Sequence, residues 1–375
     1  MLNKIYNIKF IVISLFNICI FNTKKKIKNK KIYFFYFPTR SFDKNIFEII
    51  KNLKKDKKNV IFFGYYRKNY NFFLNKKNSF LINNRLLFLL RGVDVFFSAY
   101  ITSSVPQKSK SFYMHHDILD TTLVGRENEA KTLKWLNKYN YVLTSSNLQT
   151  NFFKNLYKKN NIKCDNLFIN IGYPKLEYNL SNYKKIKIKK NFKKIIFIAP
   201  GPYDQNKEQS LYHFLKIICE VLLENNKKLK IIIRPHPLDL YSHAIIRKLL
   251  TLKKNYQNKI LIDKEKDYLK KFKSSLLLIS DISGICYTYA FTTLKPVLFY
   301  NNFKNFSDKN YFKKLFYYKL QNIIGFRFHD EKSLEKAIHE IQKKKSYGQK
   351  TKSLRNQIII YKDPIKRISR LLIKS

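Results

Sequence analysis

The stretch that decides the fold reads LLLISDISG and occupies residues 276–284. It joins an apolar run, typical of a buried parallel strand, to a small polar turn, and residues 285–293 after it can form a helix. A turn of this kind at a helix start presents backbone N–H groups and the positive end of the helix dipole to an anion. The stretch therefore predicts an α/β sheet with a phosphate-binding turn.

A second stretch, LKIIIRPHP at residues 229–237, has the same form. Its apolar run predicts another parallel strand, with polar side chains where the strand ends. Open α/β sheets bind ligands at the carboxyl ends of their strands. We therefore expect the two stretches to form one site for a diphosphate group, and its predicted residues are Arg234, His236, Ser280, Asp281, Ser283 and Gly284.

Apolar and amphipathic runs alternate along almost the whole chain, the pattern of sheets built from strand–helix–strand units. The predicted strands cover residues 31–37, 59–65, 93–99, 111–115, 141–144, 167–171, 194–199, 229–233, 260–262, 276–279 and 297–300. The predicted helices cover residues 42–53, 85–90, 127–136, 148–157, 209–223, 285–293 and 334–342. Ser145 or Ser146 and Asp330 are expected to cap two of these helices.

A polar, lysine-rich segment after Pro174 separates two series of these elements. It predicts a Rossmann-like domain at residues 1–180, a linker at 181–192, a second Rossmann-like domain at 193–350 and a helical tail at 351–375. Two such domains, with parallel sheets and a cleft between them, make up the GT-B architecture of glycosyltransferases. The predicted fold class is therefore α/β of the GT-B type.

The chain has 375 residues and a formal net charge of +50, from 75 basic and 25 acidic residues. Its 45% hydrophobic content, with 16% aromatic residues, predicts folded cores and argues against disorder. The lysines are spread along the whole sequence without a nucleic-acid-binding motif, so no nucleic acid is expected as a partner. A codon bias toward Lys, Asn, Ile, Phe and Tyr explains such charge without function, and attraction to an anionic membrane surface is the functional alternative.

Residues 10–21 form an apolar run that is followed by a cluster of lysines. A run of this length is too short to cross a bilayer, which takes about 20 residues, and no small-residue cleavage site follows it. It predicts either the first strand or helix of the N-terminal domain or an interfacial anchor on anionic lipid. No metal or cofactor is expected, because no metal-ligand spacing is found among the scattered packing residues Cys19, Cys164, Cys219 and Cys286.

Several short segments, in order, carry a resemblance to a known family: YMHH at residues 113–116, YVLTSS at 141–146, GYPK at 172–175, RPHP at 234–237, SDISG at 280–284 and KPVLFY at 295–300. They are similar to segments of the CDP-glycerol glycerophosphotransferases, which extend the poly(glycerol phosphate) chains of teichoic acids and related surface polymers. The resemblance covers roughly residues 110–302. It implies a GT-B fold and transfer of glycerol phosphate, or a related polyol phosphate, from a CDP-activated donor.

Such a transfer needs a base for the acceptor hydroxyl, and histidine titrates near neutrality. We assign this catalytic role to His116, with His115 as the alternate, because neighbouring strand residues point to opposite faces and only one can face the cleft. Arg234, His236 and the turn at residues 280–284 would hold the donor phosphates. Asp281 is expected to cap the helix or orient His236 rather than touch a phosphate.

The chain departs from the family pattern at three places. Asp117 stands where the family has glycine after its histidine, Gly284 replaces the second serine of the serine-aspartate segment, and an acidic residue expected downstream is replaced around Thr288. The departures concern the turn and the histidine segment, so they bear on the identity of donor and acceptor. The strands that predict the fold are unaffected.

The predicted function is transfer to a membrane-associated polymer or a lipid-linked acceptor, by an enzyme held peripherally on the cytoplasmic face of the membrane. A GT-B glycosyltransferase that uses a nucleotide sugar in capsule or lipopolysaccharide synthesis fits the same fold. A UDP-N-acetylglucosamine 2-epimerase fits less well, because its proton transfer on carbon calls for carboxylates that the segment after Gly284 lacks. A non-enzymatic protein that binds anionic polymer or lipid through its lysines is the remaining alternative.

Overall fold

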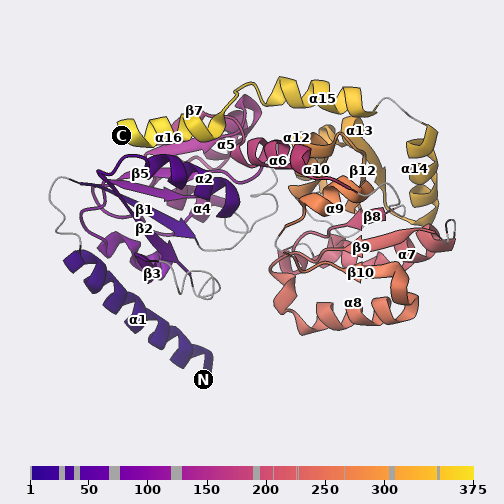
Figure 1. The fold of residues 1–375 in the computed structure, drawn as a ribbon, viewed down its shortest axis with the longest axis horizontal. Coiled ribbons are helices and arrows are strands. Elements are labelled where there is room, and N and C mark those ends of the chain that lie inside the picture. Colours follow the sequence, from indigo (N-terminus) through magenta and orange to yellow (C-terminus); the bar gives the residue numbers. More distant parts are fainter. Residues whose placement is uncertain are drawn as a thin grey trace. The chain divides into compact units, whose positions relative to one another are not determined.

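The computed structural model describes residues 2–24, 30–37, 43–66, 77–119, 129–188, 195–205, 207–224, 226, 228–265, 267–303, 309–343 and 347–375. These residues form two compact units, each built around a sheet (Figure 1). The first unit comprises the described residues of Met1–His116, Arg126–Glu177 and Ile359–Ser375. The second comprises those of Asp117–Gly125 and Tyr178–Ile358.

The sheet of the first unit consists of parallel strands. Their order is β3 (Ser79–Leu81), β2 (Asn59–Tyr65), β1 (Lys31–Phe37), β4 (Val95–Ser98), β5 (Lys110–Met114), β6 (Tyr141–Thr144) and β7 (Leu167–Asn170). The central strand β1 is buried along nearly its whole length, as expected of a parallel strand covered on both faces. The accompanying helices are α1 (Leu2–Lys24), α2 (Asp43–Leu53), η3 (Asn84–Leu89), α4 (Glu129–Leu136), α5 (Asn147–Lys159) and α16 (Pro364–Lys374), and α6 (Pro174–Lys185) begins in this unit.

The sheet of the second unit is also parallel. Its order is β10 (Ile260–Ile262), β9 (Lys230–Ile233), β8 (Ile195–Ile198), β11 (Ser275–Ser280), β12 (Val297–Tyr300) and β13 (Gly325–Phe328). The larger helices are α7 (Leu215–Glu224), α8 (His243–Tyr256), α10 (Ile285–Thr293), α14 (Glu331–Lys343) and α15 (Tyr347–Ile358). Shorter ones are η5 (Tyr203–Gln205), η6 (Lys207–Gln209), η7 (Leu211–His213), η8 (Asp239–Tyr241), η9 (Gln257–Lys259), α9 (Leu269–Ser274), α11 (Lys309–Lys314), α12 (Phe316–Lys319) and α13 (Gln321–Ile324).

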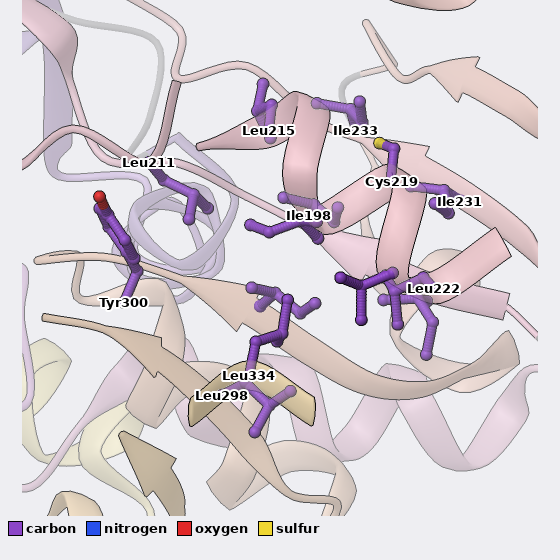
Figure 2. Packing of buried hydrophobic residues seen from close by; sticks show 14 of the residues in the cluster. Ile198, Leu211, Leu215, Cys219, Leu222, Ile231, Ile233, Leu298, Tyr300 and Leu334 are labelled. Atoms are coloured by element: carbon purple, nitrogen blue, oxygen red, sulfur yellow. The ribbon is translucent and has the colours of Figure 1, made fainter. Parts of the chain in front are cut away.

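The core of the second unit joins the sheet to helices α7, α8 and α14. Figure 2 shows side chains of the strands, such as Ile231 and Leu298, against Leu215 and Leu222 of α7 and Leu334 of α14. Cys219 of α7 is fully buried in this cluster, and burial raises the pKa of its thiol to about 12. This cysteine is therefore a packing residue, as expected from the sequence.

Helix α1 packs one side on the first sheet. The ring of Phe21 is fully buried and meets Phe34, Phe62 and Phe80 of three neighbouring strands edge to face. Asn17 Nδ2 donates to the Leu81 carbonyl oxygen at 3.0 Å, which fixes the helix to the end of β3. The run at residues 10–21 is thus a helix of the first unit. No helix among the described residues is long and apolar enough to cross a membrane.

The parallel sheets confirm the predicted α/β fold class, and most predicted strands lie within two residues of the observed bounds. The predicted helix caps are also confirmed, since Ser146 Oγ accepts from the Gln149 N–H at 3.2 Å and Asp330 Oδ1 from the Ser333 N–H at 2.9 Å. Several elements were not predicted from the sequence, among them β3, β13 and α8. The ends of some predicted elements, such as residues 127–128 and 194, lie outside the described residues.

Two predicted elements are wrong in part. Residues 209–223 do not form one helix, because α7 begins at Leu215 and short turns precede it. The helix predicted at residues 85–90 is the tighter 3₁₀ helix η3, at Asn84–Leu89. The polar segment after Pro174 was predicted to contain a linker at residues 181–192, yet helix α6 covers the segment to Lys185. Proline at a first helical position is favourable, because its missing N–H costs nothing there.

Candidate functional site

The strand order of the second sheet reverses between β8 and β11, since β9 lies on one side of β8 and β11 on the other. At such a switch point the loops after the two strands turn in opposite directions, and the crevice they leave is where open α/β sheets bind ligands. The turn at residues 280–284 follows β11, and His236 lies just after β9. Both predicted stretches therefore lie at the carboxyl edge of this sheet, around its switch point.

Two predicted phosphate-binding side chains are committed to holding the turn in place. Ser280 is fully buried, and its Oγ donates to the Ala199 carbonyl oxygen at 2.5 Å. Asp281 is also buried, and its carboxylate accepts from the backbone N–H groups of Gly201 at 2.5 Å and Leu211 at 2.8 Å. Burial raises the pKa of Asp281 to about 6, although these hydrogen bonds favour its ionised form. Both side chains fix the turn to the loop after β8, at residues 199–213.

The hydroxyl of Tyr317, on helix α12, braces the same turn from the other side. It accepts from the Ser283 N–H at 3.0 Å and lies 2.9 Å from the Asp281 carbonyl oxygen and 3.2 Å from that of Ser283. Tyr317 is fully buried, and burial raises its pKa well above the ordinary value. The backbone of the turn is therefore held rigidly where helix α10 begins at its N-cap, Gly284.

The loop after β8 packs so closely on the turn that it needs a glycine. A Cβ on Gly201 would lie 2.7 Å from the Ile282 carbonyl oxygen and 2.9 Å from Asp281 Oδ1, closer than real Cβ atoms approach. This close contact explains why a single glycine stands between Pro200 and Pro202. The glycine lets the Gly201 N–H reach the buried carboxylate of Asp281.

His236 is held by a second buried carboxylate, Asp239. The His236 N–H donates to the Tyr212 hydroxyl at 3.3 Å, and that hydroxyl bonds the carboxylate of Asp239. Asp239 also accepts from the Tyr203 N–H at 3.2 Å, and burial raises its pKa. The imidazole Nδ1 of His236 accepts from the Leu238 N–H at 3.3 Å, which favours the tautomer with its proton on Nε2.

Two adjacent residues join the predicted stretches into one framework. Leu211 donates its N–H to Asp281, and the next residue, Tyr212, accepts the N–H of His236 through its hydroxyl. The turn after β11 and the residues after β9 are thus both hydrogen-bonded to one short segment of the loop after β8. Their relative positions do not depend on long flexible side chains.

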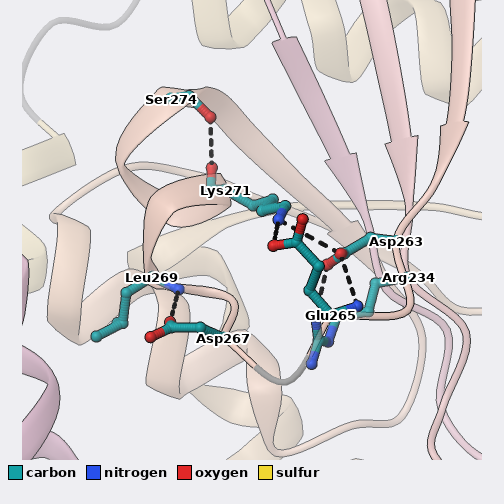
Figure 3. Close-up of polar contacts among 7 residues, drawn as sticks. All are labelled: Arg234, Asp263, Glu265, Asp267, Leu269, Lys271 and Ser274. Carbon is teal, nitrogen blue, oxygen red and sulfur yellow. Dashed lines mark hydrogen bonds and ion pairs between the residues drawn. The ribbon is translucent and has the colours of Figure 1, made fainter. Parts of the chain in front are cut away.

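Arg234 is part of a charge-balanced cluster beside β9 (Figure 3). Its guanidinium Nη1 lies 2.5 Å from Asp263 Oδ2, and that carboxylate is buried. Lys271 Nζ lies 3.5 Å from the other oxygen of Asp263 and pairs as well with Glu265. Two cationic side chains thus form ion pairs with two carboxylates, and one N–H group of the Arg234 guanidinium is bonded to Asp263. This geometry suits a residue that fixes the end of β9 better than a primary phosphate ligand.

In the first unit the two predicted histidines have different surroundings. His115 is buried, its Nδ1 lies 2.8 Å from the Tyr113 hydroxyl, and its ring meets Phe153 edge to face. His116 is half-buried, and its carbonyl oxygen accepts from the hydroxyl of Tyr173 at 2.8 Å. The GYPK segment at residues 172–175 therefore contacts the histidine segment, as two matching parts of one site would.

The sequence predicted the residues of the turn and His236, and Ser280 and Asp281 among them hold the turn, but it did not predict the other supporting groups. Tyr317, Tyr212 and Asp263 lie in stretches that carry no recognisable signal. Asp239 follows His236 by three residues, so its place near the histidine could have been expected from the sequence. Among the described residues, no group of three or more His, Cys, Asp or Glu side chains could hold a metal ion.

The model of the family described as CDP-glycerol:poly(glycerophosphate) glycerophosphotransferase matches residues 17–372. A variant of the wall teichoic acid polymerase TagF is 17% identical, covering 99% of this chain and 96% of that chain, with a TM-score of 0.63. Another TagF variant, soaked with CDPG, is 16% identical over 95% of this chain and 91% of that one, with a TM-score of 0.64. No curated protein sequence matches the chain significantly.

A UDP-GlcNAc 2-epimerase from Methanocaldococcus jannaschii, in complex with UDP-GlcNAc and UDP, is similar in structure too. It is 16% identical, covers 92% of this chain and 100% of that chain, and has a TM-score of 0.63. At such identities structural likeness shows the GT-B fold and does not separate a transferase from an epimerase. The family model makes that separation, because it spans both units and every segment that carries the resemblance. The chain belongs to the CDP-glycerol:poly(glycerophosphate) glycerophosphotransferase family.

Proposed function

We propose that this glycerophosphotransferase moves glycerol phosphate, or a related polyol phosphate, from a CDP-activated donor to a membrane-associated surface polymer. The observation that supports the proposed site is the hydrogen-bonded framework around Leu211 and Tyr212. It holds His236 and the turn at residues 280–284 next to each other at the switch point. A helix start, a braced turn and an imidazole N–H together suit the two phosphates of such a donor.

The reaction is a displacement at the β-phosphorus of the donor. The acceptor hydroxyl oxygen forms a bond to that phosphorus, while the bond from phosphorus to the bridging oxygen breaks and CMP leaves with the electron pair. A base takes the proton of the acceptor hydroxyl, and donors near the phosphates neutralise the charge that develops on CMP. Glycerol phosphate is thereby joined to the acceptor, and atoms and charge balance without a redox partner.

The residues are proposed to share these tasks as follows. His116 is the base, because His115 is buried and bonded to Tyr113. His236 donates its Nε2 proton to a donor phosphate, and Ser283 with the first N–H groups of α10 binds the other. Arg234 acts as a positioning residue through its pair with Asp263. Ser280 and Asp281 act through the turn that they hold.

A donor panel tests the reaction class. Purified protein is incubated with CDP-glycerol and, separately, with UDP-, GDP- and CMP-sugars, and the released nucleotide is measured with a poly(glycerol phosphate) acceptor present. We expect the protein to release CMP from CDP-glycerol and to consume none of the nucleotide sugars. Consumption of a nucleotide sugar instead would replace the proposal with a glycosyltransferase.

Single alanine variants test the site. We expect H116A to lower kcat by about 10²-fold to 10⁴-fold with little change in donor KM, as for loss of a general base. H236A should raise the donor KM. The control is H243A, whose histidine is exposed on α8. Unchanged kinetics in both H116A and H236A would reject the assigned site while leaving the donor test intact.

Membrane association is proposed to involve helix α1. The face turned away from the sheet exposes a stripe at helical spacing, formed by Ile8, Ile11, Val12, Leu15 and Phe16. The exposed fraction of Phe16 is 66%, which is unusual for a large apolar residue. Lys9 lies exposed beside this stripe, and the whole chain carries a net charge of +50. An apolar stripe with basic surroundings fits the surface of an anionic bilayer.

Vesicle sedimentation tests this part. The protein should sediment with vesicles that contain phosphatidylglycerol and less with pure phosphatidylcholine, and high salt should weaken the binding. V12D/F16D should lose most of it, because two charges would enter the apolar stripe. The control L250D places the same charge on an exposed leucine of α8. Equal binding of V12D/F16D and the wild type would contradict a role for α1.

A further inference from the structure

The carboxylate of Asp117 lies directly against Gly284. A Cβ built on Gly284 would be 2.1 Å from Asp117 Oδ1 and 2.7 Å from its Cγ, so no other residue type fits there without moving the aspartate. Both residues belong to the second unit, and Gly284 is the N-cap of the nine-residue helix α10. A negative charge therefore lies over the start of the helix at which a donor phosphate is proposed to bind.

The same contact accounts for two departures from the family pattern. Asp117 stands where glycine is usual, and Gly284 stands where a serine is usual. The geometry makes these two changes a matched pair, because the side chain missing at residue 284 leaves the space that the side chain added at residue 117 fills. A side chain at residue 284 would not be compatible with this packing while Asp117 is present.

A carboxylate and a phosphate compete for such a position. Both are favoured by the N–H groups and the dipole of a helix start, and two anions placed there together repel each other strongly. The segment that carries Asp117 is anchored, since the next residues, Ile118 and Leu119, are both buried. Release of the position therefore calls for rotation of the Asp117 side chain rather than for movement of the whole segment.

We propose that the carboxylate of Asp117 is an internal anion that occupies the phosphate position of the empty enzyme, and that the donor displaces it. This inference rests on the proposed function. A free inorganic phosphate would compete poorly with a tethered carboxylate. A nucleoside diphosphate brings further contacts beyond the helix start and can therefore replace it. Asp117 thus makes the site selective for the complete donor over small anions.

Binding measurements with CDP and with inorganic phosphate test this. By titration calorimetry, D117N should bind CDP about tenfold more tightly than the wild type, which corresponds to about 1.4 kcal/mol. D117G should do the same, and inorganic phosphate should inhibit both variants at lower concentrations. The control D204N removes the carboxylate of another residue of the second unit, whose side chain is 86% exposed, and should bind CDP like the wild type.

A double-mutant cycle separates competition from a simple structural role. G284S places a β-carbon where the carboxylate lies, so it should tighten CDP binding in the wild type and have no further effect in D117G. If Asp117 only caps the helix, D117N and D117G will lower the unfolding temperature and bind CDP equally well or more weakly. That result would overturn the inference.

Failure of this inference is distinguishable from failure of the proposed function. If the wild type turns over CDP-glycerol and D117N binds CDP as the wild type does, the role of Asp117 is rejected and the proposed function is not. Absence of CDP-glycerol turnover, with tighter CDP binding by D117N, would leave the internal anion standing and reject the proposed reaction.

Discussion

At the scale of single residues, the candidate site is organised by buried groups that hold its backbone in place. The Tyr317 hydroxyl is an example, because it accepts one N–H of the turn and lies within hydrogen-bond distance of two of its carbonyl oxygens. Asp281 has the same role for the loop after β8. Such groups fix the position of the α10 helix start, and a preorganised binding site needs supports of this kind.

Replacement of Tyr317 by phenylalanine should therefore affect both stability and donor binding. Y317F leaves the Ser283 N–H without its buried acceptor, which costs about 1–3 kcal/mol in the free energy of unfolding. The donor KM should rise, because the turn is no longer fixed. Denaturant unfolding and donor kinetics measure the two effects, and Y241F, at an exposed tyrosine, is the control. A stable variant with unchanged KM would show that the turn is held without Tyr317.

The raised pKa of Asp281 predicts a particular dependence of stability on pH. This carboxyl has a pKa of about 6 in the folded protein against an ordinary value of 3.8, so between these values the folded state binds a proton more readily. Its contribution to the free energy of unfolding thus falls as the pH rises from about 4 to about 6, by roughly 3 kcal/mol in total. The difference in unfolding free energy between wild type and D281N should fall over the same range.

Asp330 provides the matched comparison of opposite sign. Its hydrogen bonds with Ser333 at the start of α14 lower its pKa. Its stabilising effect is therefore lost as the pH falls through that lowered value and is complete above the ordinary pKa. The difference between wild type and D330N should grow with pH below about 4. Parallel curves for D281N and D330N would mean that burial of Asp281 does not control its titration.

At the scale of elements, the sequence predicted strands better than helix boundaries. Continuous apolar runs such as residues 31–37 are typical of a strand covered on both faces, and β1 has those bounds. The helix expected at residues 209–223 begins late, because the Leu211 N–H bonds Asp281, which is 70 residues away in sequence. Strand β13 was missed, since GFRF alternates over only four residues. The start of α7 and the formation of β13 depend on tertiary contacts, which the periodicity of the sequence does not reveal.

Some residues of the candidate site can likewise be located from the sequence, and others only from the structure. His236 and the turn at residues 280–284 follow apolar runs, so the rule for parallel sheets locates them. Arg234 follows the same rule, yet its partner Asp263 lies after another strand, and only the folded chain shows the pair. The departures of Asp117 and Gly284 from the family pattern are visible in the sequence as two separate changes. Only the structure shows that the two residues are in contact, which explains them together.

Lys295 caps a helix, and its removal should lower stability without touching the donor site. Its Nζ donates to the carbonyl oxygens of Phe272 at 3.1 Å and Lys273 at 2.8 Å and also to that of Ser275, at the end of α9. K295M leaves these carbonyl groups without their donor, which should cost about 1–3 kcal/mol in the free energy of unfolding.

The donor KM of K295M should stay unchanged, because Lys295 precedes β12 and thus lies at the amino edge of the sheet, opposite the turn. K270M, at an exposed lysine of α9, serves as the control for stability. A raised KM in K295M with normal stability would place this lysine in the donor site instead.

At the scale of the whole molecule, the chain returns to its first unit at the C-terminal end. Helix α16 packs on α2 (Figure 1), and its Ile368 and Leu372 are fully buried in the core of the first unit. The Ile365 N–H donates to Glu177 Oε2 at 2.9 Å, and Lys31 Nζ donates to the Ile373 carbonyl oxygen at 2.8 Å. The first unit is therefore closed by residues that follow the whole second unit in sequence.

A cavity in α16 should consequently destabilise residues at the opposite end of the chain. I368A removes a fully buried side chain, which costs about 2–5 kcal/mol, and limited proteolysis with peptide mapping should show faster cleavage within residues 31–116. I373A changes an exposed isoleucine of the same helix and should stay within about 0.5 kcal/mol of the wild type. If I368A is cleaved faster only within α15 and α16, the helix is a peripheral attachment and the first unit is complete without it.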